Sequence, residues 1–303
     1  MTGYHVMRKF SLLFALCIIF TIVLSGCSSD AYAEIAATTL PVYEFTARIC
    51  DGTGLSVVRL VTEEVSCLHD YSLNVRQVKA AESADLIVIS GAGLEEFLDD
   101  ILLNKEAVDA SENIRLIVPP EHHHDHDQAA EDHEGHHHEE DPHIWLSPEN
   151  AVIMAKNICH GLTQNYPEFA HIFSDNLSRL EMDLANLNAY GTDALADLSC
   201  RELITFHDGF SYLAQAFGLT ILDAIEEESG SEASAKELIH MIEEVEHHNL
   251  PAVFTEKSGS VSAAGIIARE TGAQEYTLDM AMAGDSYFDA MYQNINTLKE
   301  ALQ

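Results

Sequence analysis

Residues 167–187 read PEFAHIFSDNLSRLEMDLANL, and this stretch decides the fold. Its proline, Pro167, suits the first turn of a helix, because the backbone N–H that proline lacks would have no partner inside the helix there. Apolar side chains then recur at steps of three and four residues, the spacing that places them on one face of an α-helix. The stretch predicts an amphipathic helix of roughly 25 residues, about 38 Å long.

The segments on both sides of this helix share one pattern. Short runs rich in Val, Ile, Leu, Thr and Phe alternate with helical segments, which is typical of parallel strands joined by crossover helices. In the first half the expected strands are Ile35–Leu40, Ser56–Val61, Leu86–Ser90 and Arg115–Val118. In the second half they are Glu202–Phe206, Leu219–Asp223, Ala252–Glu256 and Glu275–Leu278. We expect an α/β fold with two lobes, each holding a four-stranded, mostly parallel sheet with flanking helices.

The long helix has two interpretations. It is either a stiff bridge between two lobes or an ordinary helix inside one large domain. The length of 303 residues suits about two domains. We take the bridging interpretation, with an N-terminal lobe over residues 34–166, the bridging helix over 167–198 and a C-terminal lobe over 199–303.

Charge limits the classes of partner. The chain has 50 Asp and Glu against 15 Lys and Arg, a formal net charge of -35. Nucleic acid and anionic membrane surfaces would repel such a chain, whereas cations are attracted to it. We therefore expect no nucleic-acid partner.

The N-terminal sequence is typical of an exported protein. Arg8 and Lys9 precede the apolar run Phe10–Leu24, which is short for a membrane-spanning helix. The following Leu24-Ser25-Gly26-Cys27 resembles the lipobox of bacterial lipoprotein signal peptides. The resemblance implies cleavage after residue 26, a lipid on the Cys27 thiol and a linker over residues 27–33. An ordinary cleaved signal or an N-terminal membrane helix are the alternatives.

Four cysteines remain in the mature chain: Cys50, Cys67, Cys159 and Cys200. They allow three disulfide pairings, between which the sequence does not choose. Free buried thiols are the alternative.

A histidine-rich insert covers residues 121–141. Its eight histidines are mixed with nine acidic residues, and such a stretch has too few apolar groups to fold by burial. We expect an exposed, flexible loop that acts as an auxiliary site for zinc, copper or nickel. An acidic solubilising loop is the alternative. The histidines are His122, His123, His124, His126, His133, His136, His137 and His138.

Four other side chains of metal-binding type follow expected strands. His207 and Asp279 come directly after strands of the second half, and His69 and His143 lie beyond strands of the first half. Ligands of parallel α/β sheets bind at the carboxyl ends of the strands. If the halves face one another, these side chains converge on one cleft. Three imidazoles and one carboxylate satisfy zinc.

The motifs around these residues resemble one known family. The resemblance rests on Cys67–Leu73, Ala84–Val88, Gly91–Glu95, Asp141–Leu146, Phe206–Leu213, Tyr276–Asp279, Gly284–Tyr287 and Asn294. The chain resembles the zinc-binding solute-binding proteins of metal ABC importers over about residues 34–302. The resemblance implies two lobes bridged by a rigid helix, with the metal between them.

The resemblance also implies the ligands and the partner. His69, His143, His207 and Asp279 would hold Zn²⁺, the transported ligand, for delivery to a membrane permease. Manganese-binding members usually have a carboxylate where this chain has His207, and a third nitrogen favours zinc. Some members have an acidic residue at the position of Leu68, so Asp279 is the better fourth ligand here. A bound water is the alternative to Asp279.

Other functions receive less support. The sequence has no HExxH motif, nucleophile elbow or phosphate-binding loop, so we expect no enzyme. A metal-storage or adhesin-type surface lipoprotein, or manganese rather than zinc uptake, are the alternatives. We expect a monomer anchored by lipid to the outer face of the bacterial cell membrane.

Overall fold

The computed structural model describes residues 32–65, 68, 71–118, 140–226, 233–257 and 262–303. The chain divides into two compact units, Met1–Tyr32 and Ala33–Gln303, and every element below belongs to the second. The predicted signal peptide, Cys27 and the histidines of the predicted insert lie outside the described residues. Within the described ranges, no helix combines the length and apolar character needed to cross a membrane.

The first sheet is parallel and has the strand order β2-β1-β3-β4. Its strands are β1 (Ile35–Ala37), β2 (Val57–Arg59), β3 (Leu86–Ile89) and β4 (Ala107–Asp109). All three residues of β1 are buried because this strand lies inside the sheet and is covered on both faces.

The fourth strand of this sheet was predicted wrongly at Arg115–Val118. The strand that pairs with β3 is β4, with Ile87 opposite Ala107. The more apolar run that was predicted has other partners, because the Ile117 N–H donates to the Tyr212 hydroxyl and the Ile117 carbonyl accepts from the Asp141 N–H. Hydrophobicity alone favoured the later run, but its backbone groups bond to residues far along the chain.

The second sheet repeats the order of the first, as β6-β5-β7-β8, and is also parallel. Its strands are β5 (Glu202–His207), β6 (Thr220–Glu226), β7 (Ala252–Glu256) and β8 (Gln274–Leu278). Every residue of β7 is buried, as expected for an inner strand of a parallel sheet. The prediction of two four-stranded parallel sheets is confirmed.

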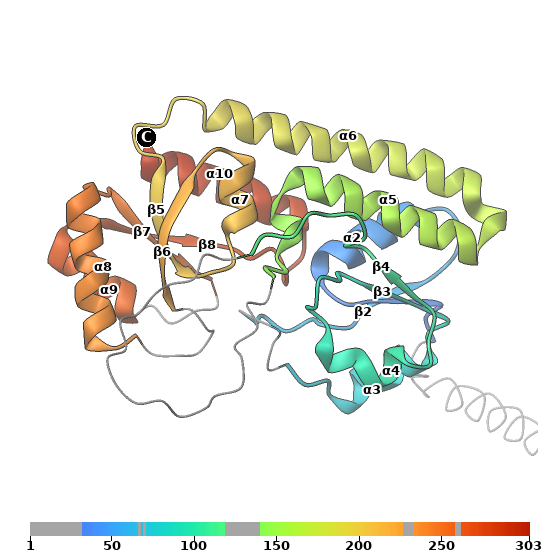
Figure 1. Ribbon diagram of the computed structural model, residues 1–303. Coiled ribbons are helices and arrows are strands. Elements are labelled where there is room, and N and C mark those ends of the chain that lie inside the picture. The colour runs from blue at the N-terminus through green and yellow to red at the C-terminus, as the bar shows by residue number, and fades with distance from the viewer. Residues whose placement is uncertain (1–31, 66–67, 69–70, 119–139, 227–232, 258–261) are drawn as a thin grey trace, which may run out of the picture. The chain divides into compact units, whose positions relative to one another are not determined.

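Helices flank both sheets (Figure 1). Four of them start with a side-chain cap, from Asn74, Ser147, Ser234 or Ser286, that satisfies backbone N–H groups of the first turn. The shorter α-helices are α2 (Leu40–Ile49), α3 (Val75–Ser83), α4 (Asp99–Leu102), α5 (Pro148–Asn165), α7 (Ser211–Ala216), α8 (Ala235–His248), α9 (Ser262–Thr271) and α10 (Tyr287–Leu302). Short 3-10 turns lie at Glu96–Leu98, Ile144–Leu146 and Pro167–Phe169.

The long helix α6 (Ala170–Ala194) has 25 residues and follows the turn Pro167–Phe169. It runs past elements of both halves in Figure 1. Asn176 donates from its side chain to the Ile49 carbonyl of α2, at 3.0 Å. Near the other end, the Tyr190 hydroxyl donates to Asn296 of α10, at 2.5 Å. The predicted helix is confirmed, and it contacts both halves.

Cys50, Cys159 and Cys200 are free thiols in the structure, and Cys67 lies outside the described residues. Burial raises the pKa of Cys50 to about 12, with a further rise from Cys159 nearby. Such a thiol stays protonated and is a poor nucleophile.

Candidate metal centre

His207 is the last residue of β5, an inner strand of the second sheet. Its exposed fraction is only 5%. The strand Leu203-Ile204-Thr205-Phe206 before it is buried, so packing on both sides of the sheet holds the backbone that carries the imidazole. The structure therefore places His207 at the C-terminal end of its strand, as the sequence predicted.

His143 comes from the first half of the chain and is also buried, with 2% exposed. It lies in the loop between β4 and α5, directly before the turn Ile144–Leu146. The Asp141 carboxylate accepts from the His143 backbone N–H at 2.9 Å and lies 2.8 Å from the ring Nδ1. A carboxylate at Nδ1 fixes the orientation of an imidazole and directs Nε2 at a metal ion. Among the described residues, no hydrogen-bond partner meets this buried Nε2.

The two imidazoles lie side by side although they belong to different halves. Their ring centroids are 5.4 Å apart and their planes are almost perpendicular, at 88°. The Trp145 ring covers His143 from another side, with centroids 5.5 Å apart. Two buried imidazoles, one of them backed by a carboxylate at Nδ1, are nitrogen donors of the kind that could hold a divalent ion of borderline softness.

Gly209 makes this approach sterically feasible. A Cβ atom at position 209 would lie 2.7 Å from Met280 Cε, 2.9 Å from His207 Cδ2 and 3.1 Å from His143 Cε1. The loop after β5, the loop after β8 and the His143 loop thus converge on a point where only glycine fits without a shift of neighbours.

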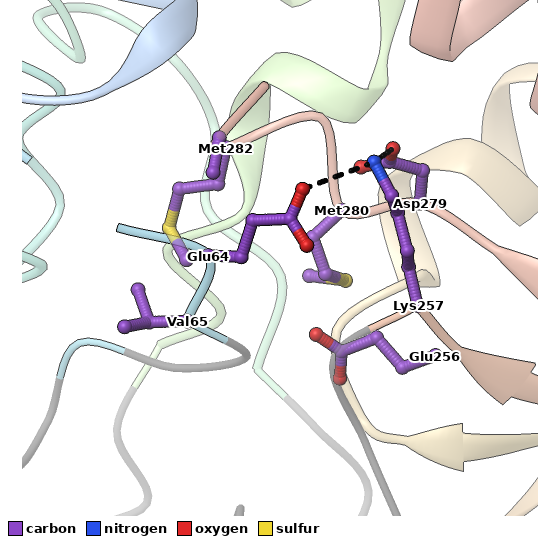
Figure 2. Close-up of a pocket in the computed structure, with 8 residues that line it drawn as sticks. Glu64, Val65, Glu256, Lys257, Asp279, Met280 and Met282 are labelled. Atoms are coloured by element: carbon purple, nitrogen blue, oxygen red, sulfur yellow. Dashed lines mark hydrogen bonds and ion pairs between the residues drawn. The ribbon is translucent and has the colours of Figure 1, made fainter. Parts of the chain in front are cut away.

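Asp279 follows β8 directly, and its carboxylate lies beside Lys257 (Figure 2). Its Oδ1 accepts from the Ala281 N–H at 2.8 Å. Its backbone N–H donates to the Asn294 side chain, which donates back to the Asp279 carbonyl at 2.6 Å. Its Oδ2 lies 3.3 Å from the ammonium of Lys257. The negative charge of Asp279 raises the pKa of Lys257.

The predicted four-ligand set is placed only in part. The structure brings His143 and His207 together, it pairs Asp279 with Lys257, and His69 lies outside the described residues. Within the described part of the chain, no three His, Cys, Asp or Glu side chains form a cluster of metal-binding geometry.

Buried hydrogen bonds connect the halves beside the imidazole pair. Trp145 donates from its indole N–H to the Met280 carbonyl at 2.7 Å, and the Tyr287 hydroxyl donates to the Trp145 carbonyl at 2.8 Å. The Tyr212 hydroxyl donates to the Asp141 carbonyl at 3.0 Å. Burial raises the pKa of Tyr212 to about 12 and raises that of Tyr287 further, so both phenols remain donors.

Glu95 is a buried carboxyl side chain at the edge of the first sheet where β1 and β3 end. Glu95 accepts at Oε1 from the Thr38 hydroxyl and the Ser90 N–H, both at 2.7 Å, and at Oε2 from the Gly91 N–H at 3.0 Å. Burial raises its pKa to about 7, against the lowering effect of these hydrogen bonds. We assign it a structural role, since it ties the loop after β3 to the end of β1.

Sequence reasoning assigned no role to Asp141, Gly209 or Lys257, although the first two lie inside the quoted motifs. Asp141 and Gly209 each stand two residues from a predicted ligand, which was a usable signal. Lys257 had no such signal, because its relation to Asp279 depends on the pairing of β7 with β8.

The family description "ZnuA: Zinc-uptake complex component A periplasmic" matches residues 35–301. The chain belongs to this family. The resemblance seen in the motifs is therefore confirmed over nearly the whole unit described above.

Individual relatives agree with the family. The zinc-binding lipoprotein AdcA of Streptococcus pneumoniae is 29% identical over 308 residues, which cover 97% of this chain and 61% of AdcA. The chain thus spans about three fifths of the length of that relative. A crystal structure of ZnuA superposes with a TM-score of 0.76 at 27% identity, covering 89% of this chain and all of the other. A zinc-bound deletion mutant of ZnuA has a TM-score of 0.74 at 27% identity, covering 89% and 98% of the two chains.

Proposed function

We propose that this protein captures Zn²⁺ outside the cytoplasm and delivers it to the membrane permease of an ABC importer. The observation that carries the proposal is the pair of buried imidazoles, His143 and His207, which come from different halves and lie in contact. The Asp141 carboxylate behind His143 supports it further, because such a partner orients a metal-binding imidazole. The family and the zinc-binding relatives agree with this reading.

The proposed ligands are His69, His143, His207 and Asp279. Three imidazole nitrogens and one carboxylate oxygen fit Zn²⁺, whereas manganese prefers oxygen ligands. We therefore propose zinc as the ion. The eight histidines of residues 121–141 are proposed as an auxiliary site that captures ions before the main site.

The cellular setting is proposed from the N-terminus. Residues 1–26 act as a lipoprotein signal peptide, and Cys27 carries the lipid that holds the mature chain on the outer face of the cell membrane. The lobes over 34–166 and 199–303, with the bridge over 167–198, act as a monomer that contacts the permease. The protein is a carrier without enzymatic activity.

Calorimetric titration tests the binding proposal. The mature chain without residues 1–26 and 121–140 is titrated with Zn²⁺ in the presence of a competing chelator. We expect one tight site per chain, and a loss of affinity of 100-fold or more in His143→Ala and His207→Ala. Asp141→Asn should lose roughly 10- to 100-fold, because it removes only the partner of His143.

His240→Ala is the control, since His240 is a half-exposed histidine that pairs with Asp223 and is none of the proposed ligands. It should bind zinc as tightly as the parent chain. Absence of a tight site in the parent chain would contradict the proposal and would assign zinc binding to residues 121–140. Tighter binding of Mn²⁺ than of Zn²⁺ would contradict the choice of ion.

Growth tests the transport proposal. A strain that lacks this protein and redundant zinc importers should grow poorly in zinc-depleted medium, and zinc should restore growth. His207→Ala, expressed at the parent level, should fail to complement. Normal growth and zinc uptake of the deletion strain would favour storage or adhesion instead.

A further inference from the structure

Lys257 lies between carboxylates of the two halves in a small cavity (Figure 2). Its ammonium is 3.3 Å from Asp279 Oδ2 in the second half and 3.4 Å from Glu64 Oε1 in the first. The remaining lining comes from Val65, Glu256, Met280, Met282 and Ala283. The Lys257 ammonium therefore pairs with two carboxylates, and one of them, that of Asp279, belongs to a proposed zinc ligand.

The three charged side chains differ in exposure and in the hydrogen bonds that hold them. Asp279 is 20% exposed, and hydrogen bonds to Ala281 and Asn294 hold it in place. The side chains of Lys257 and Glu64 are 48% and 55% exposed. A lysine ammonium is a compact point charge on a flexible four-carbon stem. The carboxylate of Asp279 is thus the fixed member of the group, and Lys257 is the member that can exchange partners.

Zinc and the Lys257 ammonium would compete for the same carboxylate, that of Asp279. The Oδ1 atom accepts from a backbone N–H, so Oδ2 is the oxygen more available to a metal ion, and Oδ2 is the atom next to Lys257. A zinc–carboxylate bond is about 2.0–2.2 Å long. An ammonium on the same oxygen would be a close like charge and would be repelled. Glu64 offers the displaced ammonium a partner it already contacts.

We propose that Lys257 sets the zinc affinity by competing with the metal ion for Asp279 and passing to Glu64 when the ion binds. This inference rests on the proposed function. The competition weakens zinc binding and speeds release, and it links metal binding to an ion pair between the halves. After zinc binds, Lys257 pairs with Glu64 alone, so the contact between residues 64 and 257 strengthens in the loaded protein.

The test compares zinc dissociation constants and dissociation rates of the mature chain by chelator competition. An exposed ion pair is worth little, so Lys257→Gln should bind zinc roughly two- to fivefold more tightly, mainly through slower release. Lys257→Arg keeps the cation and should remain closer to wild type. The matched control is Lys156→Gln, since Lys156 is also about half-exposed and also pairs with a carboxylate, Glu181, at 3.2 Å. It should leave zinc affinity unchanged.

A double-mutant cycle separates partner exchange from simple repulsion of zinc by a nearby cation. Glu64→Gln should weaken zinc binding in the wild-type background, because Lys257 then has only Asp279 as partner. The effect should shrink in Lys257→Gln. Nitrogen NMR of labelled lysines gives an independent readout, because the Lys257 Nζ signal, assigned by its loss in Lys257→Gln, should shift when zinc is added.

Three outcomes are decisive. Equal dissociation constants and rates for wild type, Lys257→Gln and Lys156→Gln, with tight zinc binding in all, would overturn this inference and leave the proposed function intact. Additive effects of Glu64→Gln and Lys257→Gln with an unmoved Nζ signal would also overturn it. Absence of a tight zinc site in the wild type would overturn both.

Discussion

Among the contacts that join the described halves, two sets differ in burial. The buried set consists of hydrogen bonds from Trp145, Tyr287 and Tyr212 to backbone carbonyls of the opposite half. The exposed set is the ion-pair group of Glu64, Lys257 and Asp279, in which two of the three side chains are about half-exposed.

The difference assigns the two sets different roles. Breaking a buried hydrogen bond leaves a polar group without water, which costs about 1–3 kcal/mol. Breaking an exposed ion pair returns both charges to solvent and costs less than about 1 kcal/mol. The buried set therefore fixes how the halves meet, and partner exchange on metal binding is confined to the exposed set.

The largest expected effect concerns Glu95, which shows within one half what burial does to an ionisable group. Its pKa in the folded chain is about 7, above the value near 4.5 of a free glutamate. The stability that protonation provides is therefore complete below pH 4.5 and is lost as pH rises through 7, by up to about 3 kcal/mol. The free energy of unfolding, measured by urea titration, should fall from pH 5 to pH 8. This fall should be smaller by about this amount in Glu95→Gln than in wild type.

The neighbouring Glu96 supplies the control, because its side chain is exposed. Glu96→Gln should keep the wild-type difference between pH 5 and pH 8. The same pH dependence in Glu95→Gln and wild type would refute the assignment of a buried, proton-binding carboxyl group.

A pair of equivalent substitutions tests the buried contacts next. Tyr287→Phe and Tyr190→Phe each remove one hydroxyl, but Tyr287 is fully buried whereas Tyr190 is 40% exposed. Tyr287→Phe leaves the Trp145 carbonyl without its hydroxyl donor and should lower the free energy of unfolding by about 1–3 kcal/mol. Tyr190→Phe should change it by less than about 0.5 kcal/mol. Equal effects in denaturant titrations would contradict the higher cost assigned to breaking a buried hydrogen bond.

Between the two halves, the smallest effect is expected at the exposed contact. Glu64→Gln in the metal-free chain should lower the free energy of unfolding by less than about 1 kcal/mol. The change should disappear near 1 M salt, where the screening length is about 3 Å. A larger, salt-independent loss of stability in the same titrations would place Glu64 among the structural contacts and would weaken the case for partner exchange at Lys257.

The sequence by itself determined the elements that depend on local spacing. The three- and four-residue repeat after Pro167 predicted α6, and the buried run before His207 predicted β5, because side-chain periodicity and strand burial are written in neighbouring residues. His207 and Asp279 were placed at strand ends for the same reason. The motifs around them were sufficient to identify the family.

The tertiary structure decided whatever depends on partners distant in the chain. Ile117 bonds to Tyr212 instead of extending a strand, and Lys257 pairs with Glu64 of the other half. The contact between His143 and His207 likewise required both halves to be folded and joined. No local pattern encodes such meetings, because they depend on how two sheets and a bridging helix pack, and packing is a property of the whole chain.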